Sequence, residues 1–173
     1  MTGAAWRASG SSGVDQERFR DVVGRFPTGV AVVTTHVGGK HHGMTANSFT
    51  SVSLDPVLVL VCVERTARLH DLVIAAGEWG VSVLSAEQEH VSRLFAQPGR
   101  PSAEALRSVP HHYGELSGAV LLDGALAAFE CRTVAGYDGG DHTVLLGEVL
   151  GTSLPRPNGS PLVYYRGEYR GLD

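Results

Sequence analysis

Hydroxyl and small side chains are concentrated in one stretch, GMTANSFTSVSLDP, at residues 43–56. Hydroxyls and amides donate and accept hydrogen bonds, and small side chains leave room for a ligand to approach the backbone. The stretch leads into an apolar, Val-rich run at residues 57–63, which is short for a helix, so we expect a buried strand there. Composition alone favours a Ser/Thr-rich edge strand with solvated hydroxyls; a wall beside a binding site is the alternative.

Basic residues follow the apolar run directly. Arg65, Thr66 and Arg68 precede a segment with helical spacing of apolar residues at 69, 72, 73 and 76. Backbone N–H groups at the start of a helix, together with a guanidinium, attract an anion. The same residues also fit a solvated helix start, so the sequence leaves both interpretations open.

His142 is the most informative of the eight histidines, because it follows Gly140 and Asp141 at the entrance to a predicted strand. The other seven fit turns or the surface, and two adjacent pairs do not make a tetrahedral metal site. Neither CxxC nor HExxH occurs, so we expect no metal. A P-loop and a strand-associated GxGxxG are also absent, so a bound nucleotide would be held by other means.

The elements that must position these residues are mostly strands. A long hairpin is expected over residues 121–151, with its turn within 137–141, and a further strand over 161–170. Three helices are expected: one opened by Asp15 and stopped by Pro27, one ended by Gly77, and one begun by a Ser85–Gln88 capping box. Residues 102–118 have no firm pattern. Regular βαβ alternation is missing, so an antiparallel barrel with helical excursions fits better than a parallel sheet.

Length and composition set outer limits. The 173 residues predict one domain over 15–173, preceded by a flexible tail over 1–14. A net charge of −4 without a basic block argues against nucleic acid. Neither a membrane-length apolar run nor a secretory signal is found, and Cys62 and Cys131 lie in apolar surroundings, so we expect a cytoplasmic protein with reduced, core-packed thiols.

Four motifs occur along the chain in order: PTGV (27–30), GMTANSFTSVSLDP (43–56), GDHTVLLGEV (140–149) and PLVYYRGEYR (161–170). Together they resemble the short-chain flavin reductases that form the small component of two-component flavin-dependent monooxygenases. The resemblance implies a split β-barrel, usually a homodimer. It also implies that NADH or NADPH, with NADH the default, reduces FAD or FMN, and that the reduced flavin is released to a separate oxygenase.

The resemblance also implies roles for individual residues. Thr45, Ala46, Asn47 and Ser48 would contact the flavin ring and ribityl chain, with Thr28 near the ring. His142 would face the flavin and contact the nicotinamide, and Tyr165 or Tyr164 would close the nicotinamide pocket. The candidates toward the phosphate lie on or near the apolar strand: Ser53, Arg65, Thr66 and Arg68. Cys62, within that strand, is a further cofactor-binding candidate.

Two other functions share such a barrel. A non-catalytic flavin-binding or electron-carrier protein would need no nicotinamide pocket, which His142 and the C-terminal Tyr-Tyr-Arg argue against. A pyridoxamine phosphate oxidase would need a more basic pocket than this chain offers. The Ala-, Gly- and Arg-rich, Lys-poor composition suggests a GC-rich source and slightly favours a role in natural-product (antibiotic) biosynthesis.

Overall fold

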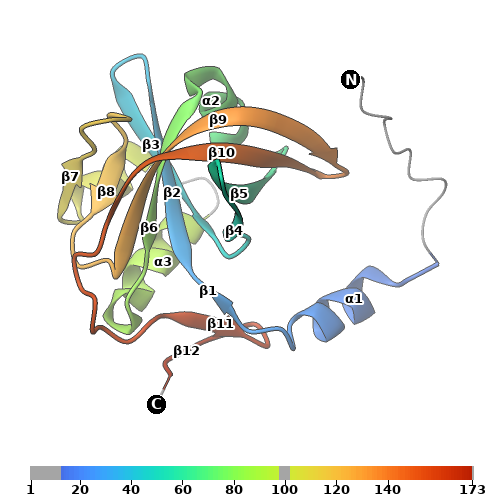
Figure 1. Ribbon diagram of the computed structural model, residues 1–173. Coiled ribbons are helices and arrows are strands. Elements are labelled where there is room, and N and C mark those ends of the chain that lie inside the picture. The colour runs from blue at the N-terminus through green and yellow to red at the C-terminus, as the bar shows by residue number, and fades with distance from the viewer. Residues whose placement is uncertain (1–12, 98–101, 173) are drawn as a thin grey trace.

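The computed structural model describes residues 13–97 and 102–172, which form mainly strands (Figure 1). The predicted tail lies outside the described residues except for residues 13 and 14. The helices are α1 (Gln16–Val23), α2 (Leu69–Ala76), α3 (Glu89–Ala96) and α4 (Ser102–Arg107), with a 3₁₀ turn, η1, at Ala86–Gln88. The strands are β1 (Thr28–Gly29), β2 (Ala31–Val37), β3 (Lys40–Ala46), β4 (Thr50–Leu54), β5 (Val57–Glu64), β6 (Glu78–Val83), β7 (His111–Tyr113), β8 (Val120–Leu122), β9 (Ala127–Gly139), β10 (His142–Ser153), β11 (Val163–Tyr165) and β12 (Glu168–Arg170).

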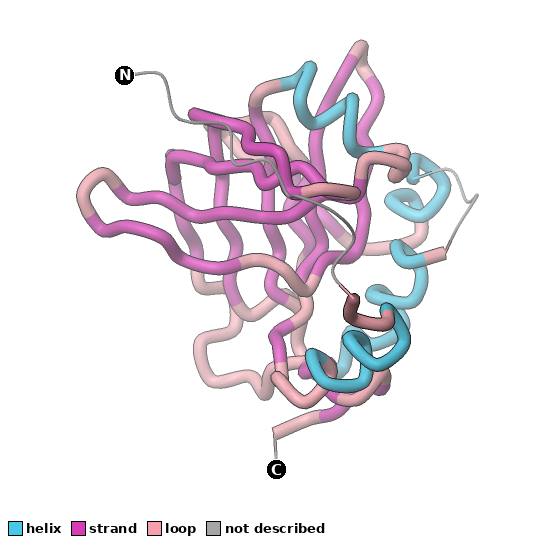
Figure 2. Tube along the Cα trace, turned by 90° about the vertical axis from the view of Figure 1, so that its right-hand side faces the viewer, coloured by secondary structure: helices cyan, strands magenta, loops and turns pink. Residues whose placement is uncertain are grey.

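Seven strands form one sheet in the order β3-β2-β6-β9-β10-β5-β4, and every pairing in it is antiparallel. The sheet is strongly curled in Figure 1, and Figure 2 shows the helices gathered to one side of the strands. Two small sheets, β1-β11-β12 and β7-β8, complete the fold. The prediction of a mainly β, antiparallel architecture with inserted helices is confirmed.

The core has two parts. One is enclosed by the curled sheet and includes Trp79, which is fully buried. The other lies between the sheet and helices α3 and α4, where Val91 and Phe95 of α3 are buried. The β5 strand serves the first part with alternate residues only: Val59, Val61 and Val63 are buried, whereas the residues between them are half-buried. The apolar run is therefore a strand, as expected, but it is buried on one face rather than two.

Ser48 joins two strands that are not neighbours in the sheet order. It lies just beyond the end of β3, and its hydroxyl accepts from the Cys62 N–H in β5 at 3.0 Å and donates to the Cys62 carbonyl at 3.1 Å. Both backbone groups of Cys62 are thereby satisfied by one side chain. The end of β3 is held beside β5, and this brings the hydroxyl-rich stretch to the strand that precedes the basic residues.

Local signals in the sequence located several elements correctly. The β9–β10 hairpin turns at Gly140 and Asp141, and Gly140 has a φ of 79°, which favours glycine. The capping box at Ser85 and Gln88 is present, and Gly77 ends α2 in the left-handed conformation. The Asp15 side chain caps α1 by accepting from the Arg18 N–H at 2.9 Å.

Two regions differ from the expectation. Residues 102–118, which lacked a pattern, contain α4 and β7. The C-terminal run is a hairpin rather than one strand, because Arg166 and Gly167 both adopt positive φ, the conformation of a tight two-residue turn. None of the helices in the described residues is long and apolar enough to span a membrane.

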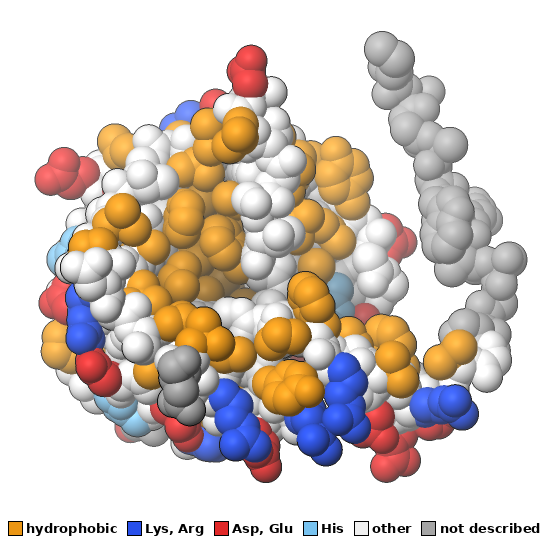
Figure 3. Space-filling view, turned by 60° about the horizontal axis from the view of Figure 1, so that its bottom comes forward, with side chains coloured by type: hydrophobic (Ala, Val, Ile, Leu, Met, Phe, Trp, Pro, Cys, Tyr) orange, Lys and Arg blue, Asp and Glu red, His pale blue; other side chains and the backbone are white. Residues whose placement is uncertain are grey.

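The first helix, α1, is amphipathic but uncovered. It lies away from the curled sheet in Figure 1, and none of its residues is buried. Its apolar side chains are exposed, with Val22 at 64%, and Phe26, just beyond the helix, is 72% exposed. Figure 3 shows further apolar side chains gathered in a hollow of the lower face, with charged side chains along its rim.

Candidate functional site

A large cavity, of about 580 Å³, lies where the end of β3, the end of β5, the start of α2 and the end of α3 meet. His142, the first residue of β10, also lines it. Eight of the twelve candidate residues from the sequence line this one cavity: Thr45, Ala46, Asn47, Ser48, Cys62, Thr66, Arg68 and His142.

One side of the cavity is formed by residues 45–48, here called the hydroxyl wall. Its two hydroxyl groups are already engaged within the protein. Thr45 Oγ1 donates to the Ser92 carbonyl of α3 at 2.7 Å, and the Ser48 hydroxyl bonds to the Cys62 backbone. These bonds fix the wall against α3 and β5. The wall therefore offers a ligand mainly small side chains, backbone groups and the Asn47 amide.

A second part of the lining, here called the ionisable wall, consists of Glu64, Thr66, Arg68 and His142. Strand pairing sets His142 directly opposite Glu64. The Glu64 carboxylate accepts from the Thr66 hydroxyl at 2.8 Å. Arg68 is the N-cap residue of α2 and makes no side-chain capping bond, so the helix start faces the cavity without a protein side chain in the capping position. This is an arrangement suited to an anion.

His142 is oriented by its neighbour in the turn. His142 Nδ1 lies 2.7 Å from the Asp141 carboxylate, and because a carboxylate only accepts, Nδ1 carries the proton. This hydrogen bond and the charge of His142 hold the pKa of the Asp141 carboxyl below its usual range. Nε2 is the nitrogen left for a ligand. The imidazole side chain is 41% exposed, which is compatible with access from solvent.

The two cysteines occupy different environments. Cys62 is half-buried and lines the cavity, and burial raises the pKa of its thiol, an effect that a hydrogen bond with Ser48 partly offsets. Cys131 is buried in the core, where burial and the nearby Glu130 raise the pKa of its thiol to about 12. Cys131 is thus a core residue, whereas Cys62 borders the candidate site.

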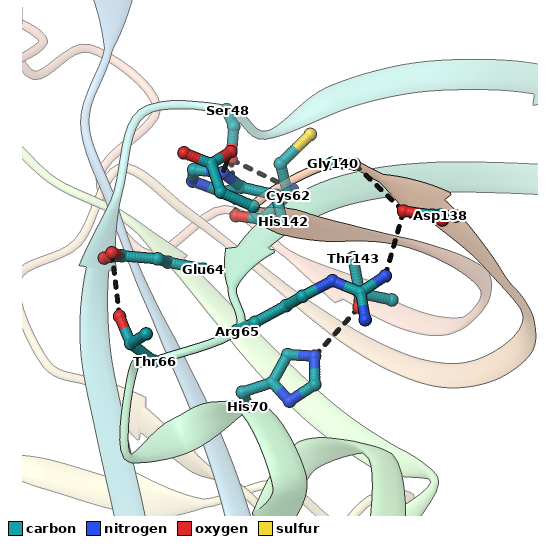
Figure 4. A network of polar contacts seen from close by, with 11 residues as sticks. Ser48, Cys62, Glu64, Arg65, Thr66, His70, Asp138, Gly140, His142 and Thr143 are labelled. Atoms are coloured by element: carbon teal, nitrogen blue, oxygen red, sulfur yellow. Dashed lines mark hydrogen bonds and ion pairs between the residues drawn. The ribbon is translucent and has the colours of Figure 1, made fainter. Parts of the chain in front are cut away.

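Four candidates lie outside the cavity. Arg65 points away from it and pairs with Asp138 at 2.9 Å, as Figure 4 shows. The Ser53 hydroxyl accepts from the Asp55 N–H at 3.2 Å in the turn after β4. Thr28 pairs with Tyr164 between β1 and β11, and within the described residues its buried Oγ1 has no hydrogen-bond partner. Tyr165, the last residue of β11, is the fourth candidate outside the cavity.

A smaller cavity, of about 200 Å³, lies on the other side of the hydroxyl wall. It shares residues 45–47 and Ala96 with the large cavity, and Val30, Tyr164 and Tyr169 complete it. Their rings meet edge to face with centroids 5.4 Å apart. Of the two adjacent tyrosines considered from the sequence, Tyr164 is the one on the side of the site, because alternation along β11 turns Tyr165 away.

Sequence reasoning missed several residues that line the large cavity. Phe95 and Gln97 come from the end of α3, and Leu69 from the start of α2. Nothing in the sequence around these three residues indicates a binding site. Their place in the lining follows only from how the two helix ends pack together. Glu64 was recognisable only as the end of the apolar strand. No group of three or more potential metal ligands was found among the described residues.

Comparison with known proteins identifies the class. The flavin reductase like domain family matches residues 23–173, and the chain belongs to this family. It is 47% identical over 158 residues to an NADH-dependent FAD reductase of Streptomyces globisporus, covering 90% of this chain and 85% of that protein. It is 41% identical over 179 residues to the NADH-dependent FMN reductase AsuE2 of Streptomyces nodosus subsp. asukaensis, covering 99% and 97%.

A solved structure agrees with these relatives. The crystal structure of BorF, the flavin reductase component of a bacterial two-component tryptophan halogenase, matches with a TM-score of 0.86 at 45% identity, covering 91% of this chain and 98% of that one. The sequence-based assignment to the flavin reductases is therefore confirmed.

Proposed function

We propose that this protein is an NADH-dependent flavin reductase that reduces FAD or FMN and supplies the free reduced flavin to a separate flavin-dependent monooxygenase. The observation that carries the proposal is that the hydroxyl wall, Arg68 at the uncapped start of α2, and His142 all line one cavity. The family and the named relatives support the same activity. The similarity to BorF supports the role as one of two components.

The residues of the cavity fit a flavin nucleotide. Its volume lies within the range of about 300–1,000 Å³ that is usual for small-molecule sites. The hydroxyl wall offers small side chains, backbone groups and the Asn47 amide, which suit a flat ring with hydrogen-bonding groups at its rim. Arg68 and the start of α2 would hold the phosphate, because a guanidinium and helix N–H groups both favour an anion.

The chain's task in the reaction is positional. NADH supplies the hydride and the flavin accepts it when both are bound, so no nucleophile from the protein is required. His142 would orient the nicotinamide through Nε2, since Nδ1 is held by Asp141. Tyr164 would close the smaller cavity next to the hydroxyl wall. Thr28, whose buried hydroxyl has no hydrogen-bond partner among the described residues, would lie near the ring.

We further propose that the protein is a cytoplasmic homodimer. The uncovered apolar face of α1 and the exposed Leu54 at the end of β4, 89% accessible, are the surfaces that a second copy would cover. Sedimentation of the purified protein tests the dimer.

The cytoplasmic location is supported by the two free thiols, which suit a reducing compartment. A role in natural-product biosynthesis fits the Streptomyces source of two of the relatives.

The test of the activity is NADH oxidation at 340 nm with and without added FAD or FMN, followed by anaerobic titration. We expect flavin-dependent NADH consumption and loss of the yellow flavin colour under anaerobic conditions. A protein that binds flavin without bleaching it on addition of NADH would be an electron carrier or storage protein instead. A protein that binds neither flavin would contradict the proposal altogether.

A further inference from the structure

Arg65 makes two contacts with the turn that carries His142. Its backbone N–H donates to the Asp141 carbonyl at 2.9 Å, and its guanidinium Nη2 donates to Asp138 Oδ1, also at 2.9 Å. The same Asp138 oxygen accepts from the Gly140 N–H at 3.0 Å. One arginine thus holds both ends of the Gly140–Asp141 turn, immediately before His142.

A third contact ties the same hairpin to α2. His70 is largely buried, and its Nε2 lies 2.8 Å from the hydroxyl of Thr143, the residue after His142. Figure 4 shows the arrangement: Arg65 extends from the end of β5 toward Asp138, while Glu64 and Thr66 lie on the other side. The hairpin is therefore fastened to the β5–α2 segment on either side of His142.

We propose that Arg65 and Asp138 are positioning residues that set the place of His142 over the cavity, and that Arg65 is not a ligand of the flavin phosphate. The inference rests on the proposed function, because it concerns the geometry of the same cavity. Arg65 does not line that cavity, whereas Arg68, three residues later, does. The two arginines of the β5–α2 segment thus have separate tasks: Arg68 faces the ligand and Arg65 faces the hairpin.

The energetics distinguish positioning from simple stabilisation. Arg65 and Asp138 are exposed, with 46% and 81% of their side chains accessible, and exposed ion pairs contribute little to folding stability. The alignment of reacting groups is far more sensitive, since a displacement of about 1 Å can cost about 100-fold in rate. A positioning role predicts a loss of reaction with NADH that greatly exceeds any loss of stability.

Two variants separate the contacts. Arg65→Ala removes the guanidinium but keeps the backbone bond to Asp141. Asp138→Asn replaces the ion pair with at most a weaker, charge–neutral hydrogen bond from Arg65 and keeps an oxygen for the Gly140 N–H. The turn itself is preserved, and this variant decides the matter if Arg65→Ala folds poorly. The matched control is Glu78→Gln, which breaks the exposed Glu78–Arg132 pair between β6 and β9, 3.1 Å apart and outside the cavity.

The measurements are the dissociation constants of FMN and riboflavin, and the anaerobic rate of flavin reduction as a function of NADH concentration. We expect both variants, but not Glu78→Gln, to lower kcat/KM for NADH about tenfold. The double variant should be no worse than either single one, because the two residues act as a pair. Binding of FMN and of riboflavin should stay at the wild-type level.

Other outcomes overturn the proposal. If Arg65→Ala weakens FMN but not riboflavin while Asp138→Asn is harmless, Arg65 is a phosphate ligand. If both variants react with NADH like the wild type, the pair does not position His142. A wild-type protein that does not reduce flavin would contradict the proposed function, and this inference with it; wild-type reduction with unaffected variants would contradict the inference alone.

Discussion

The two walls of the large cavity use their polar side chains in opposite ways. On the hydroxyl wall, the hydroxyl groups of Thr45 and Ser48 form hydrogen bonds within the protein, to the backbones of Ser92 and Cys62 respectively. On the ionisable wall, Arg68 and His142 present charged or titratable groups to the cavity. A residue that lines a site can therefore serve to shape it rather than to bind the ligand. Substitutions in the hydroxyl wall should mainly lower the stability of the protein, whereas substitutions in the ionisable wall should mainly weaken the binding of flavin or NADH.

The largest effect is expected at Arg68. Arg68→Ala should raise the dissociation constant of FMN about 10- to 150-fold, because a charged hydrogen bond contributes about 1.5–3 kcal/mol. Riboflavin, which lacks the phosphate, should bind as it does to the wild type. Fluorescence titration of both ligands checks this, with Arg132→Ala as a control far from the cavity. Equal weakening of both ligands would mean that Arg68 does not contact a phosphate.

His142 should come next. His142→Ala should raise the apparent KM for NADH about tenfold, equivalent to about 1.4 kcal/mol, and should change the flavin KM much less, because the imidazole is proposed to orient the nicotinamide. Steady-state kinetics with each substrate varied in turn provide the measurement. An unchanged KM for NADH would remove His142 from the site.

A change at Ser48 should affect the stability of the protein rather than the binding of its ligands. Ser48→Ala leaves the half-buried Cys62 N–H without its acceptor, so the free energy of unfolding should fall by about 1–2 kcal/mol. The protein that remains folded should still reduce flavin. Urea denaturation and activity below the transition check the two parts, and Ser53→Ala, which affects an exposed turn, is the control. Weaker flavin binding at unchanged stability would instead indicate a direct contact to the ligand.

The smallest effect concerns the thiols. Ellman's reagent at pH 8 should modify Cys62 slowly and leave Cys131 unmodified, since a thiol with a pKa of about 12 contains almost no thiolate at that pH. Saturating FMN should protect Cys62, because this residue lines the cavity. Cys62→Ser should abolish the labelling of the native protein. Labelling of Cys131 before unfolding would show that the core opens more readily than its burial indicates.

Much of the fold followed from local sequence signals. Capping residues, the Gly77 helix end and the Gly140–Asp141 turn depend on the preferences of a few neighbouring residues, which a sequence displays directly. Helix α4 and strand β7 were missed because short elements contain too few residues for a periodic pattern. The sequence predicts one strand where the chain forms the C-terminal hairpin, because Arg at a positive φ is uncommon and the Arg166–Gly167 turn therefore gives no recognisable signal.

The site was predictable in part, and the limit has a physical cause. Motifs and the basic residues after the apolar run indicated which segments meet, and eight of the twelve candidate residues line one cavity. Motifs did not indicate which way each side chain points. Arg65 and Arg68 are alike in sequence terms, yet the turn between β5 and α2 directs one to Asp138 and the other to the cavity. Phe95 and Gln97 reach the cavity through packing between distant segments, which no local pattern encodes.

The alternation of β5 has a practical consequence for redesign. Cys62 and Glu64 face the cavity, while Val61 and Val63, their immediate neighbours, are fully buried in the core. A library that varies only positions 62 and 64 would therefore alter the lining of the cavity while leaving the scaffold's packing intact. Retuning the choice of coenzyme in this enzyme should begin with those two positions.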